Sequence, residues 1–202
     1  MTIYQELADT IIINKKNQLI EYDDALELAG TGRSAFVFRI KSSEKAIKVF
    51  FPKFEYIAKE EATIYMTLQD ISTFPTIYAS GLNYFVMDYI DGHTLFECMT
   101  QGREITLAHI KEVDYALSLA SKLGLNPSDI HLRNIIITSK DEIIIIDVAR
   151  FRQTKNCKQW SHLKKAYHQL YRKRFFSKKI PATLLNIVAF LYKKGLIPSY
   201  QS

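Results

Sequence analysis

The chain has 202 residues, of which 48% are hydrophobic and 12% aromatic, and its formal net charge is +6. With only seven glycines and five prolines, this composition predicts a packed globular core and excludes a collagen-like or wholly disordered chain. The charge is uneven: residues 1–147 carry 14 Lys and Arg against 21 Asp and Glu, whereas residues 148–202 carry 13 Lys and Arg and no Asp or Glu.

Cysteine usage and apolar runs indicate the compartment. Cys98 and Cys157 fit no metal-ligand spacing, which favours two reduced thiols. The N-terminal residues lack the basic and apolar regions of a signal peptide, and the apolar runs at 143–146 and 184–192 are too short to span a bilayer. We therefore expect a cytoplasmic protein without a transmembrane segment.

The first ninety residues show mainly strand patterns. A short helix is expected over residues 3–13, followed by a polar turn at 14–17. β-Branched and aromatic residues between turn signals then predict five strands, at 26–29, 35–40, 45–51, 76–79 and 84–87. Residues 54–68 interrupt this series with apolar side chains at helical spacing, among them Tyr65 and Leu68. The pattern predicts a five-stranded antiparallel sheet with one helix packed on it.

The rest of the chain is mainly helical by pattern. Helices are expected at 94–100, 106–123, 158–176 and 182–194, and two short strands at 135–138 and 142–146. Gly124 is a plausible stop for the second of these helices, and Pro181 separates the last two. The fold class predicted for the whole chain is therefore α+β.

Three features of the first part could together form a phosphate-binding site. Gly30 and Gly32 bracket a tight turn in which backbone N–H groups could approach phosphate oxygens, although such a pair also occurs in ordinary hairpins. Lys48, near the end of the third strand, is either a phosphate-binding cation or an exposed strand lysine. On the following helix, Glu60 or Glu61 could pair with Lys48, or either could lie on the helix surface.

Two acidic positions stand out in the second part. Residues 129–134 (Asp-Ile-His-Leu-Arg-Asn) place a carboxylate five residues before an amide that leads into an apolar strand, a suitable spacing for a base and a metal ligand. Asp147 directly follows the apolar run 143–146. Each of these aspartates could also be a cap or turn residue when considered singly.

Taken in order, these motifs resemble the protein-kinase signature set over residues 26–151. The glycine turn matches the kinase glycine loop, with Ala35 in place of its third glycine and Val37 in register. Residues 46–48 (Ala-Ile-Lys) resemble the end of the lysine strand. The kinase catalytic loop is matched by Asp129 and Asn134, and the metal-binding aspartate is matched by Asp147.

The resemblance is to the small atypical branches. The loop at 129–134 is similar to that of RIO-like kinases, bacterial minimal kinases and aminoglycoside or choline phosphotransferases. Residues 126–129 (Asn-Pro-Ser-Asp) stand in place of His-Arg-Asp, residues 147–149 (Asp-Val-Ala) stand in place of Asp-Phe-Gly, and no Ala-Pro-Glu follows. The resemblance implies a two-lobed, protein-kinase-like fold in one domain over 1–202, with an N-lobe at about 1–88 and a shortened C-lobe at 89–202 that ends in basic helices.

The same resemblance implies ATP and Mg²⁺ as cofactors and assigns a role to each matching residue. Asp129 would orient the acceptor hydroxyl and take its proton, and His131 would either contact the γ-phosphate or stabilise the loop. Asn134 and Asp147 would hold Mg²⁺. The nucleotide would contact the glycine turn, the lysine pair and a hinge strand at 84–90, with Met87 as gatekeeper; the residues expected there are Gly30, Gly32, Val37, Ala46, Lys48, Glu61, Met87, Asp88 and Ile90.

The resemblance leads us to expect an ATP- and Mg²⁺-dependent phosphotransferase, foremost an atypical Ser/Thr-type protein kinase that transfers the γ-phosphate to a hydroxyl. Two alternatives stay open: a small-molecule phosphotransferase, and a nucleotide-regulated module that binds RNA. The basic segment 150–194 interleaves cations with aromatics. It could bind nucleic acid, attract an anionic substrate or membrane surface, or only face solvent.

Overall fold

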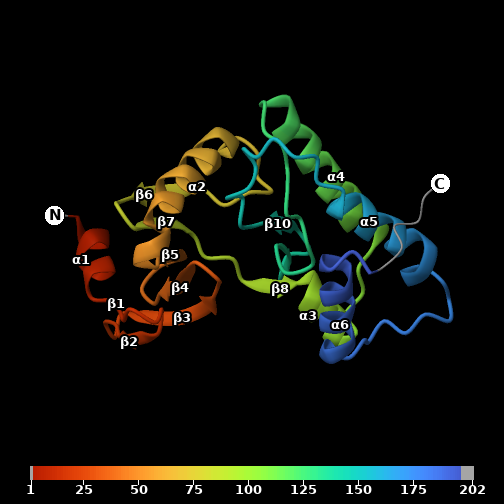
Figure 1. Ribbon diagram of the computed structural model, residues 1–202, viewed down its shortest axis with the longest axis horizontal. Helices are drawn as coiled ribbons and strands as arrows, with labels where there is room; N and C mark the ends of the chain where they lie inside the picture. Colours follow the sequence, from red (N-terminus) through yellow and green to blue (C-terminus); the bar gives the residue numbers. More distant parts are fainter. Residues whose placement is uncertain (1, 197–202) are drawn as a thin grey trace. The chain divides into compact units, whose positions relative to one another are not determined.

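The computed structural model describes residues 2–196, and the chain divides into two compact units (Figure 1). The first unit combines residues 1–90 with residues 147–152, and the second combines residues 91–146 with residues 153–202. A five-stranded antiparallel sheet and several helices together confirm the predicted α+β class.

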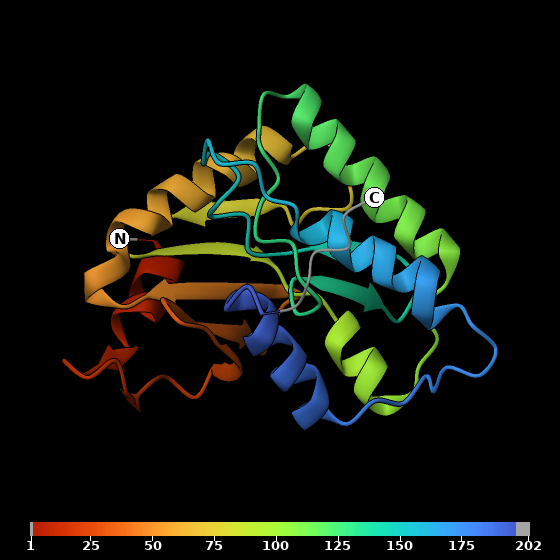
Figure 2. The same ribbon diagram turned by 45° about the vertical axis from the view of Figure 1, so that its right-hand side comes forward.

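The first unit is built on this five-stranded sheet, whose strand order is β3-β4-β5-β7-β6 (Figure 2). Its strands are β3 (Leu26–Thr31), β4 (Ala35–Ile40), β5 (Lys45–Phe50), β6 (Ile77–Ser80) and β7 (Tyr84–Asp88). All five predicted strands are present, and their bounds differ from the predicted ones by at most two residues. The antiparallel register places β5 at the centre, between β4 and β7.

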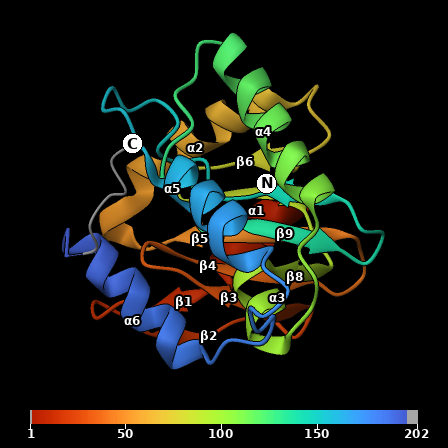
Figure 3. The same cartoon turned by 90° about the vertical axis from the view of Figure 1, so that its right-hand side faces the viewer.

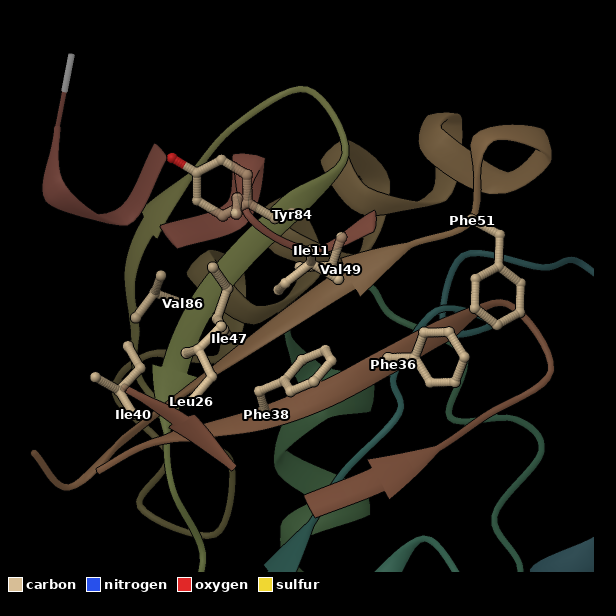
Figure 4. Close-up of a cluster of buried hydrophobic side chains, with 11 residues drawn as sticks. Ile11, Leu26, Phe36, Phe38, Ile40, Ile47, Val49, Phe51, Tyr84 and Val86 are labelled. Atoms are coloured by element: carbon tan, nitrogen blue, oxygen red, sulfur yellow. The ribbon is translucent and has the colours of Figure 1, made fainter. Parts of the chain in front are cut away.

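One face of the sheet carries an apolar cluster (Figure 4). Alternate residues of the three central strands point into this cluster, namely Phe36, Phe38, Ile40, Ile47, Val49, Tyr84 and Val86. Helix α1 (Ile3–Asp9) contributes Ala8 to the cluster, and the segment after α1 contributes Ile11. The other residues of the central strands must therefore face the opposite side of the sheet.

The predicted helix over 3–13 is too long. It ends at Asp9, and β1 (Ile12–Ile13) pairs with β2 (Leu19–Glu21) in a small hairpin. The turn explains the difference, because the Asn14 carboxamide oxygen accepts the backbone N–H groups of Lys16 and Gln18 at 2.8 and 3.0 Å. This side-chain-to-backbone bonding favours a turn over continued helix.

The opposite face of the sheet is packed by α2 (Glu55–Leu68), which follows a 3₁₀ turn at Pro52–Phe54. The residues of α2 that are buried against the sheet are Ala58, Glu61, Ala62, Ile64, Tyr65 and Leu68. The Tyr65 ring packs edge-on against Phe85 of β7, and Phe85 in turn contacts Phe50 of β5. The helix predicted at 54–68 is thus present, and its buried stripe includes one glutamate.

The second unit contains a three-stranded antiparallel sheet and helices (Figure 1). Its first elements are β8 (Gly92–Thr94), α3 (Leu95–Gln101), α4 (Leu107–Lys122), β9 (Ile135–Thr138) and β10 (Ile143–Ile145). Strand β8 was not predicted, because three residues without apolar alternation give no strand signal. Gly92 is needed there, since a Cβ at this position would lie 2.4 Å from the backbone oxygen of Ile137.

The single helix predicted over 158–176 is wrong. Helix α5 (Gln159–Ala166) continues only into one π-helical turn at Tyr167–Tyr171, and α6 (Ala182–Lys193) follows after an irregular segment (Figure 3). The Tyr171 hydroxyl accepts the Ile105 N–H at 3.0 Å and donates to the Arg103 carbonyl at 3.3 Å. These bonds hold both tyrosines of the π turn, stacked on each other, against the segment before α4.

Candidate active site

Lys48 forms a buried ion pair with a helix glutamate in the first unit. Its Nζ donates to both carboxylate oxygens of Glu61, at 2.8 Å each. Lys48 is almost fully buried and Glu61 is fully buried, whereas Glu60 on the same helix is exposed. The rings of Phe50 and Phe85 lie 5.1 and 5.6 Å from Nζ. A lysine at the centre of the sheet is thus held extended along the face that α2 covers.

The charges around Lys48 keep it protonated. Burial alone lowers the pKa of Lys48, but attraction to Glu61 and to Asp147 outweighs it, and the pKa is raised. Burial raises the pKa of Glu61 above its usual value, and attraction to Lys48 offsets only part of this shift. The two equal 2.8 Å distances are those of a carboxylate bound by an ammonium group. The pair therefore holds the Lys48 ammonium group in a fixed position.

Asp147 lies beside this pair. Its Oδ1 is 3.6 Å from Lys48 Nζ, and its side chain is 49% exposed, so one side of the carboxylate is open to solvent. The residue has φ +61°, a left-handed conformation that is uncommon for residues other than glycine. Strained backbone of this kind persists where surrounding contacts fix it.

The contact that fixes the Asp147 backbone comes from α2. The Asp147 N–H donates to the Tyr65 hydroxyl at 3.0 Å. Tyr65 lies one helical turn after Glu61, so both side chains project from the same face of α2. Burial, together with the negative charges of Glu61 and Asp147, raises the pKa of Tyr65 well above its usual value. Tyr65 therefore remains a neutral hydroxyl that accepts this hydrogen bond.

The residues expected to contact the nucleotide share one face of the sheet. Val37 is paired with Lys48 across β4 and β5, and Gly30 is paired with Val37. Met87 is paired with Ala46, two residues before Lys48. Because side chains alternate along a strand, all five lie on the face opposite the apolar cluster. The structure thus brings Gly30, Val37, Ala46, Lys48 and Met87 to one surface.

The glycine turn and the hinge are held by backbone bonds. The Gly32 N–H donates to the Ala35 carbonyl at 2.9 Å, which closes the turn between β3 and β4. The Asp88 N–H donates to the Thr76 carbonyl at 3.2 Å, and its carboxylate accepts the Thr76 N–H and the Tyr78 hydroxyl. Ile90 follows at the end of the first unit, where its side chain is half-buried.

The second unit holds the Asp129 loop in a defined geometry. Asp129 also has a left-handed backbone, with φ +60°. The buried Asn134 donates from Nδ2 to the Asp129 carbonyl at 3.0 Å, so its amide oxygen points away from that bond. The His131 carbonyl accepts the Asn134 N–H, and its Nδ1 accepts the Arg133 N–H at 3.3 Å. Both of these bonds lie within the loop and stabilise it.

The side chains of Asn134 and Asp147 are candidate metal ligands. Within the second unit, the Asn134 carbonyl accepts the N–H of Ile146 at 2.9 Å. The two candidate ligands offer an amide oxygen and a carboxylate, which are the hard oxygen donors that Mg²⁺ prefers. Within residues 2–196, no group of three or more His, Cys, Asp or Glu side chains is arranged to hold a metal ion. Mg²⁺ in phosphoryl-transfer sites needs no such group, because one or two protein oxygens and the phosphates of the substrate suffice.

Sequence reasoning missed the bond between Tyr65 and Asp147. The helical spacing places Tyr65 only in the apolar stripe of its helix, whereas its hydroxyl is also a hydrogen-bond acceptor. The available signal was the spacing of Glu61 and Tyr65, four residues apart on one buried helix face. Its target, 82 residues further along the chain, has no local signal.

The site combines a sheet lysine, a helix glutamate bound to it, and an aspartate that follows a buried strand. This combination is that of a kinase-like protein. No family model matches the chain. The chain is 46% identical over 199 residues to a protein of Bacillus subtilis (strain 168) named "Putative serine/threonine-protein kinase YrzF", and the match covers 96% of this chain and 93% of that protein. The chain therefore belongs to the same family as that protein. In the part of the chain from residue 2 to residue 196, no helix has the length and apolar content needed to span a bilayer.

Proposed function

We propose that this protein is an ATP- and Mg²⁺-dependent kinase that transfers the γ-phosphate to serine or threonine hydroxyls of a protein. The observation that carries the proposal is the buried Lys48–Glu61 pair with Asp147 at 3.6 Å from Lys48 Nζ. Phosphoryl transfer depends mainly on positioning and on neutralising charge, and this group would supply a fixed cation and a carboxylate for Mg²⁺. The name of the Bacillus subtilis relative supports the class of acceptor.

Each side chain has a distinct part in this mechanism. Lys48, held by Glu61, would bind the α- and β-phosphates. Asn134 Oδ1 and the Asp147 carboxylate would hold Mg²⁺, which when bound neutralises charge on the phosphate oxygens. Asp129 would orient the acceptor hydroxyl and take its proton. The backbone between Gly30 and Ala35 would cover the phosphates.

The adenine ring of ATP would contact the face of the sheet that carries Lys48. Val37, Ala46 and Met87 would supply apolar contacts to adenine, and the backbone of Asp88 and Ile90 would supply its hydrogen bonds. The Asp88 N–H already donates to Thr76, so the carbonyl of Asp88 is the group we assign to the base.

We further propose that the chain is one kinase-like domain of the RIO-like type. The Asp-Ile-His-Leu-Arg-Asn form of residues 129–134 supports this placement. His131 would either contact the γ-phosphate through Nε2 or stabilise the loop, in which its Nδ1 accepts the Arg133 N–H.

The test is phosphate transfer from γ-labelled ATP by the purified chain, with casein as a generic protein acceptor and with Mg²⁺ present or chelated. Removing one preorganised electrostatic contact costs about 10²–10³-fold in rate. We expect losses of this size for Lys48→Ala and for Asp147→Asn. The products should be phosphoserine and phosphothreonine, identified after acid hydrolysis.

Two exposed residues of the first unit give matched controls. Lys59→Ala changes a lysine on the surface of α2, and Asp70→Asn changes an aspartate in the turn after α2. Both controls should retain wild-type rates. Equal background rates in the wild type, Lys48→Ala and Asp147→Asn would rule out the proposed activity.

A further inference from the structure

Helix α6 exposes an apolar face that the proposed kinase activity does not use. Leu184, Ile187, Val188 and Phe190 are 50, 54, 46 and 58% exposed. At about 100° per residue, these side chains fall within an arc of about 160° on one side of the helix. Four large apolar residues at 46% exposure or more on a twelve-residue helix form a continuous patch rather than scattered surface residues.

The opposite side of α6 fixes the helix to the second unit. Asn186 Oδ1 accepts a hydrogen bond from Arg133 Nη2 at 3.0 Å, and the Tyr192 hydroxyl is 2.9 Å from His162 Nδ1. Helix α6 also packs against α3 (Figure 3). The apolar face is therefore presented by a helix that is anchored through its other side.

Cationic residues flank α6 in the sequence. The segment before α6 carries exposed Arg172, Lys173, Arg174 and Lys179, and Lys193 and Lys194 follow at its end. Phe175, between these cations, is 98% exposed. Residues 148–202 contain 13 Lys and Arg and no Asp or Glu, so no carboxylate side chain of this segment offsets the charge.

We propose that α6 and its basic flanks bind the surface of an anionic lipid bilayer. An apolar helix face combined with clustered cations is the combination that binds at membrane interfaces. The helix is about 18 Å long, shorter than the hydrocarbon core of about 30 Å, so it would lie along the surface.

The apolar residues favour lipid over nucleic acid. Proteins bind RNA through cationic side chains that contact its phosphates and through aromatic or hydrogen-bonding groups that contact its bases. Exposed leucine, isoleucine and valine side chains supply neither kind of contact. Lipid would instead bury Leu184, Ile187 and Val188 while Lys193 and Lys194 lie at the phosphates. Binding of this kind would bring a kinase to acceptors at a membrane.

The test is flotation of the full-length protein with lipid vesicles. One set is pure phosphatidylcholine, and the other contains phosphatidylglycerol as about a third of the lipid. We expect the protein to bind the anionic vesicles, and this binding should weaken as salt is raised. Binding to pure phosphatidylcholine vesicles should be about tenfold weaker. ATP is omitted, so the result does not depend on the proposed kinase activity.

Two double variants separate the apolar from the charged contribution. Ile187→Asn with Phe190→Asn should weaken vesicle binding about tenfold, because two exposed apolar side chains are lost. Its control is Tyr115→Asn with Leu123→Asn, which changes exposed apolar residues at α4 and the residue after it. Lys193→Gln with Lys194→Gln should reduce the salt dependence, and its control is Lys111→Gln with Lys122→Gln on α4. Both controls should bind as the wild type does.

Three results would overturn the proposal. The first is absence of vesicle binding by the wild type, or equal binding by it and by the Ile187/Phe190 variant. The second is a wild type that binds polyuridylate but not vesicles, with equal polyuridylate binding by this variant. The basic segment would then be an RNA-binding segment. The third is a wild-type dimer in light scattering that this variant dissociates, since α6 would then bind a second copy of the chain.

Discussion

The hydroxyl of Tyr65 is the only atom of that side chain that a change to phenylalanine removes. It accepts the N–H of Asp147, whose left-handed backbone places a carboxylate beside Lys48. The Tyr65 ring would stay in contact with Phe85 in a phenylalanine variant. The hydroxyl and the ring can therefore be separated by experiment.

For Tyr65→Phe we expect weaker metal binding with a folded protein. A buried hydrogen bond contributes about 1 kcal/mol, which corresponds to roughly a fivefold change in an equilibrium constant. In the proposed mechanism this would raise the Mg²⁺ concentration needed for half-maximal transfer about fivefold. A titration of Mn²⁺ followed by electron paramagnetic resonance in the presence of ATP should show the same shift.

Tyr84→Phe is the matched control, since Tyr84 is also buried in the first unit but belongs to the apolar cluster on the other face of the sheet. Its metal requirement should equal that of the wild type. An unchanged requirement in Tyr65→Phe would remove the role of the hydroxyl without affecting the proposed activity.

Helix α2 carries a glutamate where its sequence pattern calls for an apolar residue. The prediction of this helix succeeded because its other buried residues recur at helical spacing. The choice between Glu60 and Glu61 could not be made from spacing alone, because the two are adjacent and the sheet face they approach is set by tertiary packing. In the structure Glu61 binds Lys48 and Glu60 is exposed.

For Glu61→Gln we expect a loss of about 3–5 kcal/mol in the free energy of unfolding, because the change leaves a nearly buried lysine without its main partner. Glu60→Gln on the same helix should change this free energy by at most about 0.5 kcal/mol. Urea unfolding followed by tryptophan fluorescence and circular dichroism measures both. Equal effects of the two substitutions would contradict the assignment of the buried charge.

The hydroxyl of Tyr171 is one of the groups that hold the π turn at the end of α5. Tyr171→Phe would leave the backbone N–H of buried Ile105 without its acceptor. We expect a loss of about 1–3 kcal/mol in the free energy of unfolding. Tyr115→Phe, at an exposed position of α4, should change it by at most about 0.5 kcal/mol. A thermal or urea denaturation series in which both variants behave alike would show that the hydroxyl has no such part.

Across the whole molecule, elements with a local sequence pattern were predicted better than features that depend on long-range contacts. The five strands of the first sheet and α4 have strong periodicity, and they were placed to within two residues. Strand β8 and the irregular segment after Tyr171 were missed, because a backbone approach at Gly92 and hydrogen bonds to Arg103 and Ile105 determine them. The order of the site motifs was visible in the sequence, whereas the bond of Tyr65 to Asp147 joins residues too far apart to show a pattern.

Ligand binding should be visible in the stability of the whole chain. If Mg²⁺ and ATP bind only the folded protein, ATP at 100 times its dissociation constant stabilises it by about 2.7 kcal/mol. For a chain of this size we expect a rise of about 5–10 °C in the melting temperature. Differential scanning fluorimetry should show the rise with Mg²⁺ and ATP together, and much less of it in Asp147→Asn. An equal rise in Asp147→Asn and in the Asp70→Asn control would show that Asp147 does not hold the metal.

Helix α2 contacts two of the proposed site residues, because Glu61 binds the Lys48 ammonium and the Tyr65 hydroxyl accepts the Asp147 N–H. Both contacting side chains lie one turn apart on the same helix. A displacement of α2 would therefore disturb the position of Lys48 and the backbone conformation of Asp147 at the same time.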